Sequence, residues 1–369
     1  MITALQILFV LSAVVTSLGF VFVYQGWRRA LRIPPQAGAR DEVTVVVAAH
    51  NEARRIPRLL DALTAQSYPQ ERVRVIVVDD RSDDDTAAVA RAHGRDLQLT
   101  VLRVDEVPDG VSPKKFALHR GITAAETDIV LCTDADCEPE TDWIGAMLRS
   151  FDRGSDVVTG LAPLRAGTSA SSGYAAFESR RSMALMTAAA AWGVPYMAAG
   201  RSWGFRRDVY NSCGGLAPLY AHLGGDDDLL LQRMVAAGAR VGCCVEPDAQ
   251  VHSPAPESWR ALYRQKLRHY RVGAAYRGRG AMLLGLLLGA ELTTMLSGVA
   301  LLAALPGLQK LLPLLLMLWT VWYASGFLVA PFKWMRGDHG RASLAKWEGF
   351  HIFYSVIVSL LSHFRPSRW

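Results

Sequence analysis

Two long stretches of this chain are almost free of charged residues. Residues 1 to 27 carry no charged side chain, and residues 281 to 332 carry only Glu291 and Lys310. Because roughly 20 apolar residues suffice to cross a bilayer core as a helix, the first stretch predicts a membrane anchor. The second stretch is interrupted by Pro306 and Gly307 and therefore predicts a hairpin of two spanning helices.

A shorter apolar stretch lies within residues 347–369. Its polar residues recur at every fourth position and mark one helical face: His351, Ser355, Ser359 and His363. This helix either crosses the membrane a fourth time or lies in the interface, with the polar face toward water or the rest of the protein. The basic Arg365 and Arg368 favour the interfacial form, because basic residues tend to remain on the cytoplasmic side.

Residues 41–280 alternate between short apolar runs and helical patterns. Four runs predict strands, at residues 42–49, 72–79, 97–104 and 128–134. Helices are predicted between them, at residues 53–66 and from about Pro113. Strands this uniformly apolar are covered on both faces, and helical connections imply parallel order. The pattern predicts an α/β fold with a Rossmann-like, mostly parallel sheet flanked by helices.

Polar side chains gather where three of the predicted strands end. They are His50, Asn51 and Glu52 after the first strand, Asp79 and Asp80 at the end of the second, and Asp134 and Asp136 after the fourth. Ligands of doubly wound sheets bind at these strand ends. Taken alone, the stretch "DAD" also fits a solvated turn. Repulsion between two such close carboxylates raises a pKa unless a cation lies between them, so the pair predicts a metal site.

Six segments occur in the order and spacing of a known enzyme family: "VVVAAHNEARRIPRLLDAL", "VIVVDDRSDDDT", "PKKFALHRGI", "VLCTDADCEP", "GGDDDLLLQRMVAAG" and "QKLRH". In these segments, residues 41 to 280 resemble the membrane-anchored family 2 glycosyltransferases, which are inverting enzymes of the GT-A fold with nucleotide-sugar donors. The resemblance implies a catalytic domain over residues 41–256, followed by a basic interfacial segment over residues 257–280.

The resemblance also implies which residues bind the donor. Asp79 or Asp80 would bind the base and ribose, in a pocket lined by the histidine, asparagine and glutamate after the first strand. Asp134 and Asp136 resemble the family's DxD pair, which binds the diphosphate through Mg²⁺ or Mn²⁺, and hard oxygen ligands suit both ions. Further positive charge near the phosphates would come from Lys114 and Lys115, although one of these two fits a solvated helix residue.

On the acceptor side, "GGDDDLLLQ" resembles the acidic pair that precedes a helix in this family. The resemblance gives Asp227 the role of general base and Asp226 that of its acidic neighbour, with a register that one residue could shift. "QKLRH" resembles the QxxRW motif, with His269 in place of tryptophan, and implies that Gln265 and Arg268 hold the acceptor or the diphosphate. A second interpretation is a basic helix at an anionic leaflet, formed by Arg264, Lys266, Arg268, Arg271, Arg277 and Arg279.

Charge distribution predicts the orientation in the membrane. The basic cluster Arg28, Arg29 and Arg32 follows the anchor, whereas the predicted hairpin tip carries one basic residue, Lys310. By the positive-inside rule the catalytic domain is cytoplasmic, on the inner face of the cell membrane. The sequence pI of about 9.1 is explained by these juxtamembrane arginines, and no nucleic-acid partner is expected. Five cysteines without a CxxC pair predict no disulfide framework.

Together these features predict an inverting glycosyltransferase. It would move a sugar from a UDP- or GDP-linked donor to a membrane-associated acceptor, a lipid or a glycan, at the cytoplasmic face. Three alternatives remain open at this point: a processive polysaccharide synthase of the same family, a nucleotidyltransferase that shares the paired aspartates, and a noncatalytic membrane scaffold.

Overall fold

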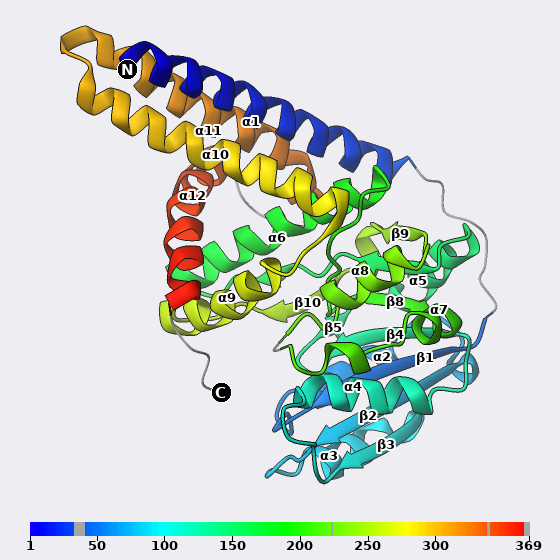
Figure 1. Ribbon diagram of the computed structural model, residues 1–369. Coiled ribbons are helices and arrows are strands. Elements are labelled where there is room, and N and C mark those ends of the chain that lie inside the picture. The colour runs from blue at the N-terminus through cyan, green and yellow to red at the C-terminus, as the bar shows by residue number, and fades with distance from the viewer. Residues whose placement is uncertain (33–40, 223, 338–339, 365–369) are drawn as a thin grey trace.

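The chain folds into an α/β domain with a bundle of long helices at one end (Figure 1). The computed structural model describes residues 1–32, 41–222, 224–337 and 340–364. The residues Arg365 and Arg368, as well as the side chain of His363, lie outside the described part. All five cysteines are buried and free.

The centre of the α/β domain is a seven-stranded sheet with strand order β3-β2-β1-β4-β8-β6-β9. Its strands are β1 (Val43–Ala49), β2 (Val73–Asp80), β3 (Gln98–Val104), β4 (Ile129–Asp134), β6 (Val157–Gly160), β8 (Trp203–Arg206) and β9 (Val241–Cys244). Only β8 runs antiparallel, to both β4 and β6. The predicted α/β class and mostly parallel sheet are confirmed.

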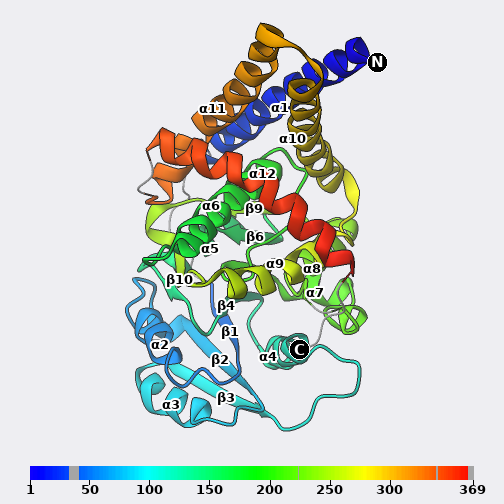
Figure 2. The same cartoon turned by 90° about the vertical axis from the view of Figure 1, so that its left-hand side faces the viewer.

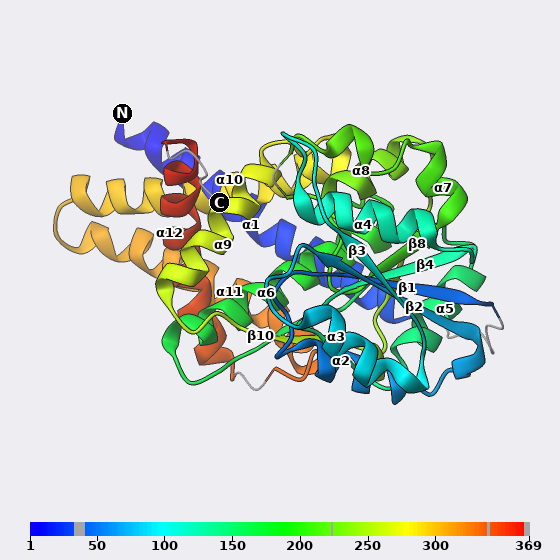
Figure 3. The same cartoon turned by 90° about the horizontal axis from the view of Figure 1, so that it is seen from below.

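Helices cover both faces of this sheet (Figure 3). One face carries α4 (Pro113–Ala124), α7 (Arg207–Ser212) and α8 (Asp228–Ala236), and the other carries α2 (Ile56–Thr64), α3 (Thr86–His93) and α5 (Trp143–Asp152). The side chains of β1 alternate between two apolar cores, Val45 and Val47 in one and Val46 in the other. Burial on both faces explains why the strand sequences are uniformly apolar.

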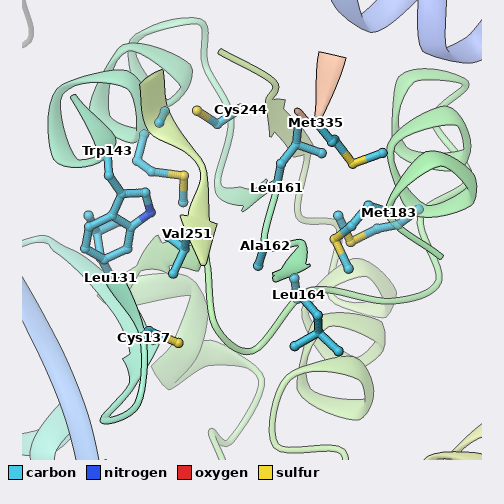
Figure 4. Packing of buried hydrophobic residues seen from close by; sticks show 14 of the residues in the cluster. Leu131, Cys137, Trp143, Leu161, Ala162, Leu164, Met183, Cys244, Val251 and Met335 are labelled. Atoms are coloured by element: carbon cyan, nitrogen blue, oxygen red, sulfur yellow. The ribbon is translucent and has the colours of Figure 1, made fainter. Parts of the chain in front are cut away.

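A second, three-stranded sheet has the order β5-β10-β7, from Glu138–Pro139, Val251–Pro254 and Leu164–Arg165. Figure 4 shows the apolar side chains of Leu161, Met183 and Val251 packed in one cluster with Met335. Met335 directly follows the long helix Leu311–Trp334, which belongs to the bundle. The helical bundle and the α/β domain therefore share a hydrophobic core. Short 3₁₀ helices cover Gln70–Arg72, Gly94–Asp96, Ala217–Leu219, Pro247–Ala249 and Gly307–Lys310.

Three helices of the described chain are long and apolar enough to cross a membrane. They are α1 (Ile2–Leu31), α10 (Gly278–Ala304) and α11 (Leu311–Trp334), and they run side by side in Figure 1. The hydroxyl of Thr294 in α10 donates to Ser12 in α1 at 3.0 Å. At the other end of α1, Gly26 lies against α6 (Ala170–Ala191), where an added Cβ would come within 2.8 Å of the Ala188 carbonyl oxygen.

Two further helices connect the bundle to the α/β domain (Figure 2). They are α9 (Trp259–Gly273) and α12 (Arg341–Phe364), and α12 begins six residues before the predicted segment 347–369. A buried ion cluster joins three helices: Arg181 of α6 lies 2.6 Å from Glu291 of α10 and 3.0 Å from Glu348 of α12. All three side chains are at most 4% exposed.

We expect Arg181→Met to lower the free energy of unfolding by about 3–5 kcal/mol, because it leaves two carboxylates buried without a cationic partner. Denaturant titration of the purified protein in detergent would measure the loss. Arg103→Met is a matched control, since Arg103 is 59% exposed and pairs with the exposed Asp105, and it should change stability by less than about 1 kcal/mol. A wild-type stability for Arg181→Met would contradict this account of the cluster.

Candidate active site

A cleft of about 270 Å³ opens at the carboxyl ends of β1, β2 and β4. Three parallel neighbours in the sheet end at the same edge there, so polar residues from distant parts of the sequence meet. The side chains around the cleft are Ala48, Ala49, His50, Glu52, Asp80, Lys114, Asp134, Ala135 and Asp136. Six residues predicted to bind the donor or the metal therefore meet at this cleft: His50, Glu52, Asp80, Lys114, Asp134 and Asp136.

The loops after β1 and β2 are held to each other by hydrogen bonds. The backbone N–H of Asn51 donates to the Ser82 hydroxyl at 3.0 Å. His50 Nδ1 donates to the backbone carbonyl oxygen of Asp80 at 2.6 Å. Both loops contain a non-glycine residue in the left-handed region, Asn51 with φ 58° and Arg81 with φ 53°. Such backbone strain persists only where surrounding contacts fix it.

The adjacent carboxylates Asp79 and Asp80 have different environments. Asp80 lines the cleft and accepts a hydrogen bond from Arg81 Nε at 2.8 Å. Asp79 is 1% exposed, and its Oδ1 accepts the backbone N–H of Ser82 at 3.3 Å, which closes the turn after β2. Of the two aspartates that the sequence offered as the base and ribose ligand, Asp80 is the one in contact with the cleft.

Asp134 and Asp136 end β4 with their carboxylates on the cleft. Burial favours the neutral form of Asp134, but the charges of Lys114 and Arg201 outweigh burial and lower its pKa below the ordinary value. At Asp136, burial and the charge of Asp134 raise the pKa. The repulsion expected from the sequence is therefore present.

One atom each from Asp134, Asp136 and Cys137 lies within 4.8 Å of the others, a grouping that could hold a metal ion. Burial raises the pKa of the Cys137 thiol, so this sulfur stays protonated and is a poor ligand. The remaining donors are carboxylate oxygens, which suit Mg²⁺ or Mn²⁺ better than a soft metal. The residues present thus fit a hard divalent cation.

The neighbouring lysines at the start of α4 point to different places. Lys114 Nζ lies 2.8 Å from Asp134 Oδ1 and 3.1 Å from Asp226 Oδ2, so one ammonium bridges the acidic groups of two distant segments. The Lys115 side chain is 0% exposed, and its ammonium donates to the carbonyl oxygens of Leu219 and His222. Lys115 is thus neither a solvated helix residue nor a residue of the cleft, and its ammonium is bound by these carbonyl oxygens, away from the site predicted for the phosphates.

The three successive carboxylates before α8 also differ in their contacts. Asp226 faces Lys114. Asp227 accepts the Gly200 amide at 2.7 Å and the Asp228 amide at 2.8 Å, and burial, followed by the charge of Asp226, raises its pKa to about 6. Asp228 accepts the Ala198 amide and the Tyr276 hydroxyl. Because its partners are all internal, Asp228 is a structural residue, and the candidate bases remain Asp227 and Asp226.

Arg201 is a residue of this site that sequence reasoning missed. It follows Gly200, and its backbone carbonyl oxygen accepts a hydrogen bond from the hydroxyl of Thr133, the residue before Asp134. Its guanidinium donates to Ser253 Oγ at 2.5 Å, and its charge acts on Asp134 and Asp136. The stretch "AAGRSWGFRRDVY" contains three arginines, and nothing in the sequence distinguishes Arg201 from the other two.

The "QKLRH" motif lies on α9. His269 is exposed, and the charges of Lys266, Arg268, Arg201 and Lys114 act on it, so it shares the surroundings of the cleft. Gln265 Oε1 is buried and accepts no hydrogen bond from any described residue. Lys266 is 7% exposed and pairs with Glu178 of α6. Lys266 therefore points inward, and its predicted place on a lipid-facing basic surface is wrong.

Comparison with known proteins agrees with this geometry. The family described as "Glycosyltransferase like family 2" matches residues 39–271, more than half of the chain. The chain belongs to this glycosyltransferase family, and the predicted family and enzyme class are confirmed.

Two curated relatives resemble parts of the chain. An uncharacterized glycosyltransferase of Mycobacterium tuberculosis (strain H37Rv) is 38% identical over 122 residues, which are 33% of this chain and 49% of that protein. The 4,4'-diaponeurosporenoate glycosyltransferase of Staphylococcus aureus (strain MRSA252) is 39% identical over 95 residues, 26% of this chain and 24% of that protein. The chain thus spans about half or less of the length of these relatives.

Among solved structures, the mannosyltransferase PcManGT from Pyrobaculum calidifontis, in complex with GDP-Man and Mn²⁺, has a TM-score of 0.61 and 21% sequence identity. The similarity covers 94% of this chain and 99% of that chain. It shows a shared GT-A fold that extends over nearly all of both chains.

Proposed function

We propose that this protein transfers a sugar from a nucleotide-sugar donor to a lipid acceptor at the cytoplasmic face of the cell membrane. The observation that carries the proposal is the Lys114 bridge, which brings the carboxylate pair after β4 within one side chain of the acidic pair before α8. A site of this kind places a donor diphosphate beside a candidate general base. The GDP-Man and Mn²⁺ bound by the fold relative PcManGT support a nucleotide-sugar donor and a divalent ion.

In this proposal, Asp80, His50, Asn51 and Glu52 hold the nucleoside in the loops after β1 and β2. Asp134 and Asp136 hold Mg²⁺ or Mn²⁺, and a divalent cation there would stabilise the negative charge that develops on the leaving nucleoside diphosphate. In this proposal the charge on the diphosphate is also balanced by Lys114, which lines the cleft, and by Arg201 and Arg268.

Asp227 takes the proton from the acceptor hydroxyl while the acceptor oxygen attacks the anomeric carbon of the donor sugar. The bond from that carbon to the diphosphate oxygen breaks in the same step, so the configuration inverts. The Asp227 carboxylate is oriented by the backbone N–H groups of Gly200 and Asp228. Its remaining lone pairs can accept the proton. In this proposal Gln265, whose Oε1 accepts no hydrogen bond from a described residue, contacts the acceptor together with His269.

The membrane helices support a lipid acceptor. Three helices that can span a bilayer share a core with the catalytic domain, so the cleft is held near the membrane surface. Cytoplasmic orientation is supported by Arg28 and Arg29 at the catalytic end of α1, against a single basic residue, Lys310, at the hairpin tip.

A donor screen tests the proposal. The purified protein in vesicles of bacterial lipid extract would receive radiolabelled UDP- and GDP-linked sugars one at a time, with Mn²⁺ or Mg²⁺ present. We expect one donor to give nucleoside diphosphate release together with one labelled lipid that carries a single sugar. Label in long polymer would instead indicate the processive synthase, and formation of nucleotide-sugar from a sugar phosphate would indicate the nucleotidyltransferase.

A further inference from the structure

The outward face of α12 is a stripe of large apolar side chains. Phe350, Phe353, Ile357 and Leu361 are 38%, 52%, 58% and 38% exposed. Their spacing of three and four residues places them on one side of the helix. A continuous apolar stripe of this kind is unfavourable in water and marks a surface that binds something apolar.

The opposite face of α12 is fixed to the protein through polar contacts. Glu348 pairs with Arg181 of α6, and His351 Nδ1 lies 2.8 Å from the Tyr174 hydroxyl. The polar face that the sequence offered to water or to the catalytic domain thus packs inward at His351, which is 6% exposed. At the start of the stripe the Phe350 ring contacts those of Tyr174 and Trp259, whereas Phe353 and Ile357 are more than half exposed.

The direction of α12 differs from that of the membrane helices. In Figure 1 the three long helices run side by side, whereas α12 crosses them, and its Glu348 and Ile352 lie with Thr16, Glu291 and Thr320 near the middles of α1, α10 and α11. Glu348 belongs to the same ion cluster as Glu291 of α10. This cluster fixes α12 at the position of Glu291 along α10. The helix α12 is not among the described helices that are long and apolar enough to span a bilayer.

We propose that the stripe binds the lipid surface of the membrane, with α12 lying in the boundary between headgroups and acyl chains. The exposed apolar surface of α10 and α11 adjoins it, and the same bilayer that surrounds those helices would cover the stripe. The ring of Trp259 at the start of α9 lies 5.6 Å from that of Phe350 and is 42% exposed, which extends the surface with a residue typical of membrane interfaces. Lys346 is exposed at the start of the stripe, where it suits an anionic headgroup.

Spin labels on the full-length protein test this inference. Single cysteines would replace Phe353, Ile357 and Leu361, and the native cysteines can stay because all five are buried. Labelled protein would be placed in vesicles of phosphatidylcholine and phosphatidylglycerol, and depth would be measured from accessibility to oxygen and to a water-soluble nickel complex. Leu318→Cys, 59% exposed on α11, and Arg103→Cys on the α/β domain give the deep and aqueous references.

We expect the three labels on α12 to lie at one shallow depth, between the two references and within about 5 Å of each other. A spanning helix rises 1.5 Å per residue, so it would separate positions 353 and 361 by about 12 Å in depth. Such a gradient would overturn the proposal. Accessibility equal to that of Arg103→Cys would also overturn it, as would short label-to-label distances between molecules, which would show that a second copy covers the stripe.

Discussion

Replacement of Asp227 by asparagine should lower kcat by about two to four orders of magnitude and leave the KM for the donor nearly unchanged. The amide keeps the size of the side chain and one oxygen to accept the Gly200 amide, but it cannot take a proton. Steady-state rates of nucleoside diphosphate release, with the donor identified by the screen, would measure both constants.

Asp228→Asn is the matched control for this variant. Burial, followed by the charge of Asp227, raises the pKa of Asp228 well above its ordinary value, which favours the neutral form of the native side chain. An amide can replace a neutral carboxyl beside Tyr276 and Ala198, and kcat should stay near that of the wild type. If Asp227→Asn is fully active while Asp226→Asn is inactive, the base is Asp226 and the register is shifted by one residue.

Asp227 should also set the acidic limb of the pH profile of kcat/KM. Since burial and the charge of Asp226 raise the pKa of Asp227 to about 6, the ionised, proton-accepting form dominates at pH 7 and is lost as the pH falls. We expect kcat/KM to decrease about tenfold per unit below pH 6 and to level off above it. In Asp227→Asn the limb should be absent from the residual activity, and a wild-type profile that is flat from pH 5 to 8 would contradict the assignment.

Removal of divalent cations should reduce transfer by about two orders of magnitude or more, because several kcal/mol of leaving-group stabilisation is lost. Mn²⁺ or Mg²⁺ added after the chelator should restore the rate. Asp136→Asn should be inactive with either ion and should lose Mn²⁺ binding in calorimetry, a readout that does not depend on activity.

Cys137→Ala is the control for the metal prediction. The thiol lies beside the two carboxylates but stays protonated, so its removal should leave the response to chelator and Mn²⁺ unchanged. Full activity of the wild type in excess chelator would show that cationic side chains such as Lys114 and Arg201 suffice to stabilise the leaving group.

The parts of the fold that sequence predicted well depend on local patterns. An uncharged run of 27 residues at the N-terminus has few alternatives to a membrane helix, and α1 is a helix long and apolar enough to cross a membrane. The runs that became β1, β2 and β4 are apolar because the strands are buried on both faces, and each ends in polar residues. Parallel strands share an edge, so the meeting of Asp80, Asp134 and Asp136 at one cleft could be expected from the order of elements alone.

Side-chain direction on the helices could not be predicted in the same way. Lys114 and Lys115 are neighbours in sequence, yet one bridges two acidic groups while the other is buried against carbonyl oxygens. Successive helical residues point about 100° apart, and only the packing of α4 against the sheet decides which of them meets the cleft. Lys266 points inward for a similar reason, because Glu178 of α6 lies opposite it.

The sequence by itself determined the family, the class of fold, the helices long and apolar enough to span a membrane, and the acidic positions that could bind a metal, since each of these follows from the order of residues along the chain. Only the tertiary structure decided that Arg201 faces the carboxylate pair, that Asp228 is structural and that α12 turns its apolar side outward. These outcomes depend on partners from segments far apart in the chain, such as Ser253, Tyr276 and Arg181. Contacts between distant segments are fixed by how helices and strands pack in three dimensions, and that packing leaves no local pattern in the residues themselves.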